Sequence, residues 1–153
     1  MSNVNQDSSV QARCVGDAAI IYASDYLNKL SGERIERECK RQLESGRRAL
    51  IINFRDTELV NSIGVSILVG VIDAAEQNTA RLIFSDVNNH TAELFQMLGL
   101  TRHVSVVASE DEALSLVSEA RGFFLSQSAS FPRGRRPYAA IDAQFLMHNV
   151  RRF

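Results

Sequence analysis

Residues 59–68, Leu-Val-Asn-Ser-Ile-Gly-Val-Ser-Ile-Leu, decide the fold because they follow closely on a short apolar run at residues 49–54. That run, Ala-Leu-Ile-Ile-Asn-Phe, has the composition of a buried β-strand and is bounded by charged residues. After it, apolar residues recur with the i, i+3, i+4 and i+7 spacing of a helix, which is predicted over residues 62–77. These residues are Val65, Leu68, Val69 and Ile72. A strand followed by an amphipathic helix is the repeating unit of α/β folds.

Ser62 lies at the beginning of this predicted helix. Asn61 and Ser62 are residue types that cap helix N-termini, and Gly64 keeps bulk away from the first turn. The free backbone N–H groups at such a position can also receive a phosphate. Two interpretations stay open: Ser62 caps the helix, or its hydroxyl is exposed and is a site of phosphorylation.

Strands and helices alternate along residues 10–120. Strands are predicted at residues 10–14, 18–23, 49–54, 81–86 and 104–107, and helices at residues 31–45, 62–77, 91–98 and from 110 onward. Gly16-Asp17 is typical of a hairpin turn, and Ser109 to Glu112 is typical of a capping box. The predicted fold is a single α/β domain, with a mixed, mostly parallel sheet of about five strands and about four helices mainly on one side. One core is expected, formed by Ile51, Phe54, Leu68, Ile72, Leu82, Phe84, Leu94 and Leu98.

The 153 residues, 45% of them hydrophobic, suit one domain with its own core and an additional tail. Residues 1–9 are expected to be a flexible N-terminus, residues 10–120 the domain and residues 121–153 the tail. No run of 18 apolar residues occurs and the N-terminus lacks a secretion signal, so the sequence predicts a cytoplasmic protein without a membrane span. Cys14 and Cys39 each lie in an apolar stretch and are expected to be buried thiols.

Charge is distributed unevenly along the chain. Residues 1–120 hold 11 basic and 17 acidic side chains, a net charge of −6, whereas residues 121–153 hold six Arg and one Asp, a net charge of +5. The acidic domain argues against direct binding of nucleic acid. The tail also contains aromatic residues, with Tyr138, Ile141, Phe145 and His148 at helical spacing. It is therefore interpreted as a short helix that docks on the domain or on a second copy, as a segment that contacts anionic lipid or nucleic acid, or as an extension without a role.

Motifs for catalysis and cofactor binding are missing from the sequence. It has no Gly-x-x-x-x-Gly-Lys-Ser/Thr motif and no Gly-x-Gly-x-x-Gly after a strand. His90, His103 and His148 lack the spacing of metal ligands. A triad of Ser62, His90 and Asp86 lacks the Gly-x-Ser-x-Gly elbow. The sequence thus predicts no enzyme, no metal site and no cofactor. Ser62 is more naturally the substrate of another enzyme or part of a binding surface.

Three motifs in order carry a family resemblance: Asn28-Lys29-Leu30-Ser31, Asn61-Ser62-Ile63-Gly64, and a helix with a Gly-Leu exit at residues 94–100. With these motifs the chain resembles the anti-sigma factor antagonist branch of the STAS-domain family over about residues 10–120. The signature of that family is Asp-Ser-(small)-Gly at the start of a helix, and an Asp-x-x-Thr segment comes just before its first helix. Ser62 and Gly64 match this signature, whereas Asn61 and Ile63 depart from it, and Asn28 replaces the acid of the second segment.

The resemblance implies a STAS-type fold and a mechanism without catalysis. Such a domain binds an anti-sigma factor that has protein kinase activity and so releases the sigma factor, until phosphorylation of Ser62 breaks the complex. A phosphatase and a second copy of this chain are further candidate partners. A phosphate adds about −1.5 to −2 charge at an interface, while a helix N-terminus tolerates it. Phosphorylation of Ser62 can therefore break the complex without unfolding the domain. The implied partner-binding residues are Asn28, Ser31, Asn61, Ser62, Ile63 and Gly64.

The departures from the signature keep an alternative open. Asn28 and Asn61 retain hydrogen-bonding side chains but carry no charge. Ile63 is either a contact residue or an obstacle to a kinase. The alternative is a STAS scaffold or interaction module in another partner-switching system, which is constitutive and not phosphorylated. A ligand-sensing STAS domain is less favoured because the sequence has no pocket signature.

Overall fold

The computed structural model describes the backbone of residues 10–127 and the side chains of residues 10–118. In chain order its elements are β1 (Ala12–Val15), β2 (Ala18–Tyr22), β3 (Tyr26–Leu27), α1 (Lys29–Glu44), β4 (Ala49–Asn53), β5 (Leu59–Val60), α2 (Ser62–Gln77), β6 (Arg81–Ser85), α3 (Asn89–Met97), the 3-10 helix η2 (Leu100–Arg102), β7 (Ser105–Val107) and α4 (Glu110–Gln127). Within these residues, no helix has both the length and the apolar character that a membrane span requires. The predictions for residues 1–9 and for residues 128–153 lie outside the described residues.

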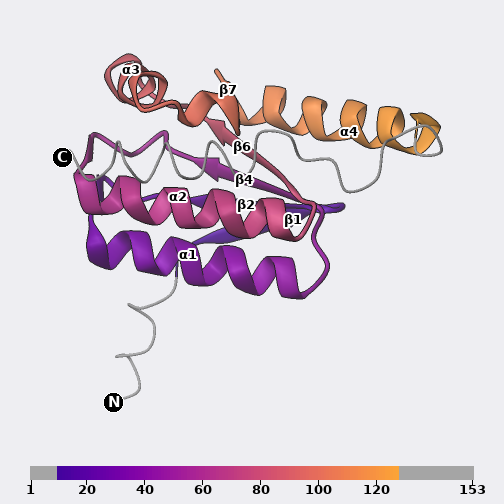
Figure 1. Cartoon of the computed structure of the whole chain (residues 1–153), viewed down its shortest axis with the longest axis horizontal. Coiled ribbons are helices and arrows are strands. Elements are labelled where there is room, and N and C mark those ends of the chain that lie inside the picture. The colour runs from indigo at the N-terminus through magenta and orange to yellow at the C-terminus, as the bar shows by residue number, and fades with distance from the viewer. Residues whose placement is uncertain (1–9, 128–153) are drawn as a thin grey trace.

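Five of the strands form one sheet in the order β1-β2-β4-β6-β7 (Figure 1). β1 pairs antiparallel with β2 through the predicted turn, where Gly16 has a φ of +59°, in the left-handed region that glycine adopts readily. The pairs β2–β4, β4–β6 and β6–β7 are parallel, so each needs a crossover connection, and all three crossovers contain helices. The predicted mixed, mostly parallel sheet with four α-helices is confirmed.

The larger part of the core lies between the sheet and the pair α1 and α2. At one end of this layer Phe54, Phe84 and Phe95 meet with ring centroids 5.1 to 5.7 Å apart. Leu68 of α2 is buried in the same cluster, as predicted, whereas Leu94 of α3 is only half-buried at its margin. The aromatic cluster thus connects α3 to the ends of β4 and β6.

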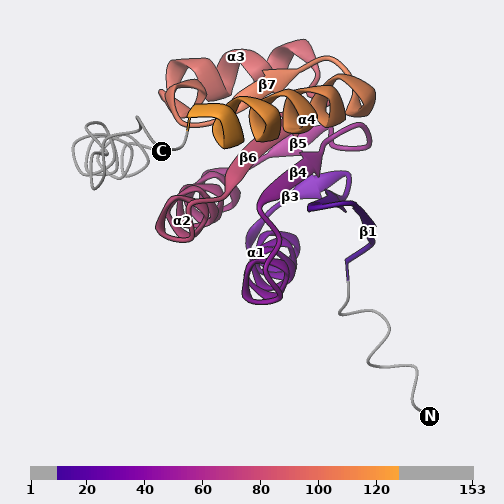
Figure 2. The same cartoon turned by 90° about the vertical axis from the view of Figure 1, so that its right-hand side faces the viewer.

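The opposite face of the sheet is covered by α4, as Figure 2 shows. Ile20, Ile51 and Ile83 of three adjacent strands are fully buried there against Ala113 of α4. The prediction of one core that includes Ile51 is therefore wrong, because side chains alternate along a strand and a central parallel strand buries both of its faces.

The two cysteines differ in burial. Cys39 of α1 is fully buried, as predicted, and burial raises the pKa of its thiol. Cys14 is exposed, so the prediction of its burial is wrong. The reason is that β1 is an edge strand, and Cys14 lies at the margin of α1 with its Sγ 3.7 Å from Gln42 Oε1.

The first turn of α4 attaches that helix to the sheet. Glu110 Oε1 accepts hydrogen bonds from the Tyr22 hydroxyl at 2.9 Å and from Asn53 Nδ2 at 3.0 Å, and its other carboxylate oxygen pairs with Arg13. Burial by itself would raise the pKa of Glu110, but the hydrogen bonds from Tyr22, Arg13 and Asn53 outweigh it and hold the pKa below its usual range.

α4 begins at the predicted cap. Ser109 Oγ accepts a hydrogen bond from Glu112 N at 3.1 Å, and the Glu112 carboxylate accepts one from Ala108 N at 3.2 Å. The helix continues to Gln127, past residue 120, where composition predicts the end of the domain. The domain limits stay a prediction, and a division between domain and tail is better placed after residue 127.

Replacing Glu110 by Gln should make stability less dependent on pH in the acid range. Because its folded pKa is lowered, the carboxylate stabilises the fold above the unfolded value of about 4.3, and this stabilisation is lost as pH falls through the folded pKa. At pH 7, Glu110→Gln should lower the free energy of unfolding by about 1 kcal/mol, since hydrogen bonds to a charged acceptor are stronger. The difference from wild type should shrink below about pH 4.

Urea denaturation at a series of pH values measures this difference. Asp111→Asn, an exposed change in the same turn, is the control and should show a smaller difference. A Glu110→Gln deficit that stays constant from pH 7 to about pH 3 would contradict the role of the carboxylate charge.

Candidate functional site

The short strands β3 and β5 bring the N-termini of α1 and α2 together. They form a separate two-stranded parallel sheet, in which Tyr26 pairs with Leu59 and Leu27 with Val60. Directly after β5, Asn61 N donates a hydrogen bond to Leu27 O at 3.0 Å. The sequence does not predict these strands, because two residues are too few for a periodic pattern. The loop of Asn28 therefore does lie beside Ser62.

At the start of α1, two of the predicted contact residues hold the helix cap. Asn28 Oδ1 accepts a hydrogen bond from Ser31 N at 3.0 Å, and Ser31 Oγ accepts one from Asn28 N at 3.0 Å. Ser31 Oγ also donates to Tyr26 O at 2.7 Å. The predicted helix start at Ser31 is wrong, because this reciprocal cap starts α1 at Lys29 and makes Ser31 its third residue. Asn28 Oδ1 and Ser31 Oγ are thus engaged within the domain.

At the start of α2, Asn61 is the cap and Ser62 is the first helical residue. Asn61 Oδ1 accepts a hydrogen bond from Gly64 N at 2.8 Å, and Asn61 Nδ2 donates to the Tyr26 hydroxyl at 3.3 Å. The interpretation of Ser62 as the cap is therefore wrong. Within residues 10–118 the Ser62 hydroxyl makes no hydrogen bond, so it remains available for chemistry.

Ser62 is half-buried, whereas the sequence analysis expects its hydroxyl to be exposed. The first turn of α2 lies against the end of β3, where Asn61 N bonds to Leu27 O and Gly64 approaches Leu27 closely. Neither α1 nor α2 has an acidic residue in its first turn. The positive ends of two helix dipoles therefore face this region without a carboxylate in either first turn, and the N–H groups of α2 would stabilise a phosphate on Ser62.

Exposed apolar side chains surround Ser62. Tyr26 is 42% exposed, Leu30 60%, Leu59 60% and Ile63 49%, and we call these four residues the apolar patch. Two other large hydrophobic residues among those described, Val15 and Met97, are similarly exposed. The exposure of Ile63 agrees with the sequence analysis, which missed the other three because they lie on a two-residue strand or off the buried face of α1.

Carboxylates lie around the apolar patch. Asp25, Asp56 and Glu58 are exposed, and we call them the acidic rim. Asp25 O accepts backbone hydrogen bonds from Glu58 N at 2.7 Å and from Leu59 N at 3.2 Å, so the rim is held directly to the patch. The cations nearby are the exposed Lys29 and Arg55, and the guanidinium of Arg55 lies 5.0 Å from the ring centre of Tyr22.

Gly64 has the space-saving role that the sequence indicates. A Cβ on Gly64 would overlap Leu27 O and would lie 3.0 Å from both the carbonyl carbon and Cγ of Leu27. Any larger residue would therefore push α2 away from β3. Within the described residues, no group of three or more His, Cys, Asp or Glu side chains is placed to hold a metal ion.

Comparison with known proteins identifies the family. A model of the STAS domain matches residues 9–113. This chain belongs to the STAS domain family. The expected family is confirmed on residues that include β1 to β7, α1 to α3 and the start of α4.

Several solved structures share this STAS fold. SpoIIAA from Bacillus, in its unphosphorylated form, is 21% identical over 72% of this chain and 98% of its own, with a TM-score of 0.59. An anti-sigma factor antagonist from Mycobacterium paratuberculosis is 16% identical over 72% of this chain and 93% of its own, with a TM-score of 0.63. A variant of RsbS from Moorella thermoacetica is 16% identical over 73% and 97%, with a TM-score of 0.65. A comparison with curated protein sequences yields no match.

Gly64→Ala should destabilise this STAS domain, although alanine favours helices. Overlap with the backbone of β3 should lower the free energy of unfolding by about 1–3 kcal/mol. Gly70→Ala on the same helix is the matched control, because its Cβ would meet only the carboxylate end of Glu36 at 3.3 Å. That variant should be neutral or more stable by up to about 1 kcal/mol. Urea midpoints of the two variants that shift equally would show that the contact with Leu27 is not a constraint.

Proposed function

We propose that this STAS domain is an anti-sigma factor antagonist whose apolar patch binds an anti-sigma factor with protein kinase activity. Binding releases the sigma factor, and phosphorylation of Ser62 ends the binding. The observation that carries this proposal is the position of Ser62. Its hydroxyl takes no part in capping α2 and lies among four exposed apolar side chains.

The apolar patch has the composition of an interface centre. An aromatic residue and three aliphatic residues are exposed together, and exposed carboxylates surround them. Specific interfaces bury such an apolar centre and leave a polar rim in contact with water. The backbone beneath is held by the β3–β5 pair and by two helix caps, so a partner meets a surface that is ordered in advance.

Phosphorylation of Ser62 would act on the interface more than on the fold. The phosphate would add about −1.5 to −2 charge beside the apolar patch, and a partner would have to desolvate that charge on binding. The free N–H groups of α2 would stabilise it within the domain. One modification can therefore abolish binding while the domain stays folded.

The asparagines at the two caps are compatible with this role. Asn is as good a cap as Asp, so replacing Asp in the signature keeps the helix starts in place. The replacement removes negative charge next to Ser62. Partner recognition is then expected to rest on the apolar patch and on the acidic rim, rather than on charges at the caps.

The similarity to SpoIIAA supports the proposal by analogy. Structures of SpoIIAA exist in an unphosphorylated and in a phosphorylated form, at 21% and 22% identity to this chain. In this role the domain acts in the cytoplasm and needs no catalytic residue, cofactor or nucleic acid of its own. A phosphatase would restore the active form, and a second copy of the chain is a further candidate partner.

The alternative is a constitutive STAS interaction module in another partner-switching system. The half-burial of Ser62 favours it, because a kinase would need to draw the hydroxyl into its own active site. The same apolar patch would then bind its partner without a covalent switch. The two functions differ in one measurable property, which is whether ATP changes the affinity.

Ser62→Ala should stay folded and stay bound to the kinase when ATP is present. Because Asn61 provides the cap, the free energy of unfolding should change by less than about 0.5 kcal/mol. Ser62→Asp should fold at least as well, since an acid suits a helix N-terminus. It should bind the anti-sigma factor at least about 30-fold more weakly, because a charge is buried there without a partner. Ser118→Asp adds the same charge on α4, where it is exposed, and should bind like wild type.

Titration calorimetry with the candidate anti-sigma kinase, with and without ATP, measures these affinities, and mass spectrometry locates the phosphate. Equal affinity for wild type, Ser62→Ala and Ser62→Asp, with no phosphate on Ser62, would exclude the phosphorylation switch. Binding that persists in all three would then support the constitutive module.

Leu30→Ser and Leu59→Ser test the apolar patch itself. Both side chains are 60% exposed, so each variant should keep its stability within about 0.5 kcal/mol. Each should weaken partner binding by about 5-fold or more, as expected for central interface residues. Met97→Ser on α3, where the side chain is 78% exposed, is the control and should leave affinity unchanged. If Met97→Ser weakened binding and the two leucine variants did not, the partner would bind at α3 instead.

A further inference from the structure

Nothing within residues 10–118 covers the apolar patch, although its four side chains are among the most exposed apolar residues of the described chain. The acidic rim lies beside it, on the loops that follow β2 and β4. In a parallel sheet these loops all leave the same edge. One end of the domain therefore combines exposed apolar side chains with the exposed carboxylates of Asp25, Asp56 and Glu58.

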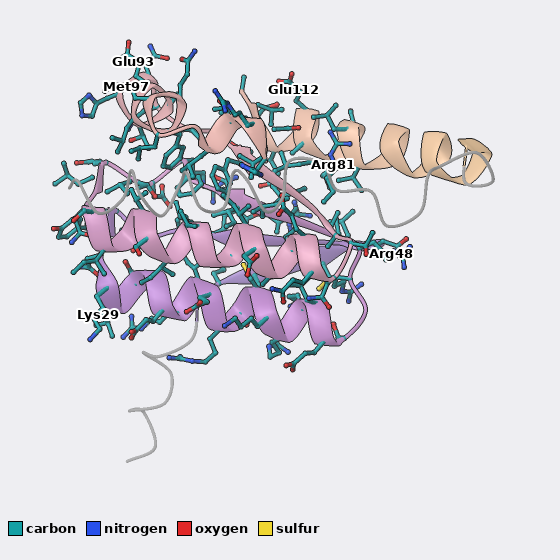
Figure 3. The ribbon with its side chains drawn as sticks, viewed as in Figure 1. Lys29, Arg48, Arg81, Glu93, Met97 and Glu112 are labelled. Atoms are coloured by element: carbon teal, nitrogen blue, oxygen red, sulfur yellow. The ribbon has the colours of Figure 1, made fainter. Side chains whose placement is uncertain are left out.

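At the opposite end of the domain, arginines and carboxylates occur together, since Asp17 precedes β2 and Glu44 is the last residue of α1. Arg47 and Arg48 come just before β4, and Arg81 is the first residue of β6, so all three lie where parallel strands begin. Figure 3 shows Lys29, at the start of α1, and Arg48 at opposite ends of the molecule. The combination of exposed carboxylates with the apolar patch therefore belongs to the end that holds Lys29 and Ser62.

α4 carries the chain to the end of the domain that holds Arg48. Its first turn contacts Tyr22 and Asn53, which are the last residues of β2 and β4, and the helix then runs back past the sheet. The C-terminal end of α4 lies at the same end of the molecule as Arg48 (Figures 1 and 3). α4 therefore ends at the end of the domain that is opposite the apolar patch.

Residues 128–153 have a composition that complements the acidic rim and the apolar patch. They hold five arginines and one aspartate, a net charge of +4. They also hold the aromatic residues Phe131, Tyr138, Phe145 and Phe153. Aromatic and arginine side chains are the residue types that contribute most to binding at interfaces. The arginines would be attracted by the carboxylates of the acidic rim.

The length of the segment allows it to return to the patch. At about 3.3 Å per residue, the 26 residues from 128 to 153 can span about 86 Å. α4, with 18 residues, and α1, with 16, are about 27 and 24 Å long at 1.5 Å per residue. Even the two helix lengths end to end are shorter than this reach.

We infer that residues 128–153 dock on the apolar patch of their own chain, with aromatic side chains on the patch and arginines at the acidic rim. The docking itself needs no partner. Because the segment is tethered, its effective concentration at the patch is high, on the order of millimolar. It would shield the apolar patch from solvent and compete with any protein that binds there.

The regulatory consequence rests on the proposed function. A phosphate on Ser62 would add negative charge beside the docked arginines, which form strong charge-assisted hydrogen bonds with phosphate oxygens. Phosphorylation would then strengthen the docking of residues 128–153 while it weakens the binding of the anti-sigma factor. The segment would make the switch more complete by occupying the vacated surface.

Paramagnetic broadening in the full chain tests the docking without any partner. A nitroxide is attached at Ala139→Cys in a Cys14→Ser background, because Cys14 is exposed whereas Cys39 is buried. The amide signals of Tyr26, Leu30, Leu59 and Ile63 should lose intensity, and those of Arg48 and Arg81 should keep it. The same labelled chain with Arg133, Arg135 and Arg136 all changed to Gln is the matched control, and its patch signals should recover.

Three results would overturn the inference. Broadening of amide signals in α4 or at Arg48 and Arg81 would place the segment elsewhere. No selective broadening would show that it does not dock. A mixture of labelled, isotope-free chain with unlabelled, ¹⁵N-enriched chain reports docking between copies. Broadening of the patch signals in that mixture, as strong as in the single chain, would assign the surface to a second copy.

Affinity for the anti-sigma kinase tests the consequence separately. If nine-tenths of the chains hold the segment docked, the triple Arg→Gln chain should bind the kinase about tenfold more tightly than wild type. Equal kinase affinities of the two chains, together with broadened patch signals in wild type, would show that the docked segment does not compete with the kinase. No kinase binding by either chain would refute the proposed function and leave the docking result intact.

Discussion

The contact between the end of β3 and the first turn of α2 is the constraint on which the functional surface depends. The hydrogen bond from Asn61 N to Leu27 O, 3.0 Å long, and the close approach of Gly64 to Leu27 join two segments far apart in sequence. Through this contact the N-termini of two helices become neighbours. Tyr26 and Leu59, which pair in the small sheet, are then exposed next to Ser62 and Ile63 instead of being buried. Without the glycine the helix starts would separate, and the apolar patch would no longer be continuous.

The division of roles at the helix starts explains how a switch can be built into a stable fold. Asn28 and Asn61 satisfy the backbone N–H groups that begin each helix, so Ser62 contributes little to stability. The two helix dipoles favour negative charge at the same place. The large core beneath α1 and α2, together with the second core under α4, holds the surface rigid. A charge added at Ser62 would therefore change what the surface binds and leave the fold in place.

The parallel sheet also determines at which end of the molecule several charged residues lie. All parallel strands begin at one edge, next to Arg47, Arg48 and Arg81, and end at the other, near Asp25, Asp56 and Glu58. The net charge of the whole chain, −1, does not show where these charged residues lie. The exposed carboxylates of Asp25, Asp56 and Glu58 attract a basic molecule to the end that holds Ser62. This electrostatic attraction acts on a protein partner and on residues 128–153 of the same chain.

The sequence by itself determined the elements whose patterns are long enough to be read. The periodicity of α2, the Gly16 turn, the Ser109 cap, the burial of Cys39 and the order of motifs around Ser62 and Gly64 were all predicted, and with them the sheet and the family. Only the tertiary structure decided that Asn61 and not Ser62 caps α2, that Ser31 belongs to a cap, that Ile51 faces α4 and that Cys14 is exposed on an edge strand. It alone placed Tyr26, Leu30 and Leu59 around Ser62. The physical reason is range: helices and strands follow from repeated local spacing, whereas a two-residue strand pair and an exposed surface arise from contacts between residues more than thirty positions apart.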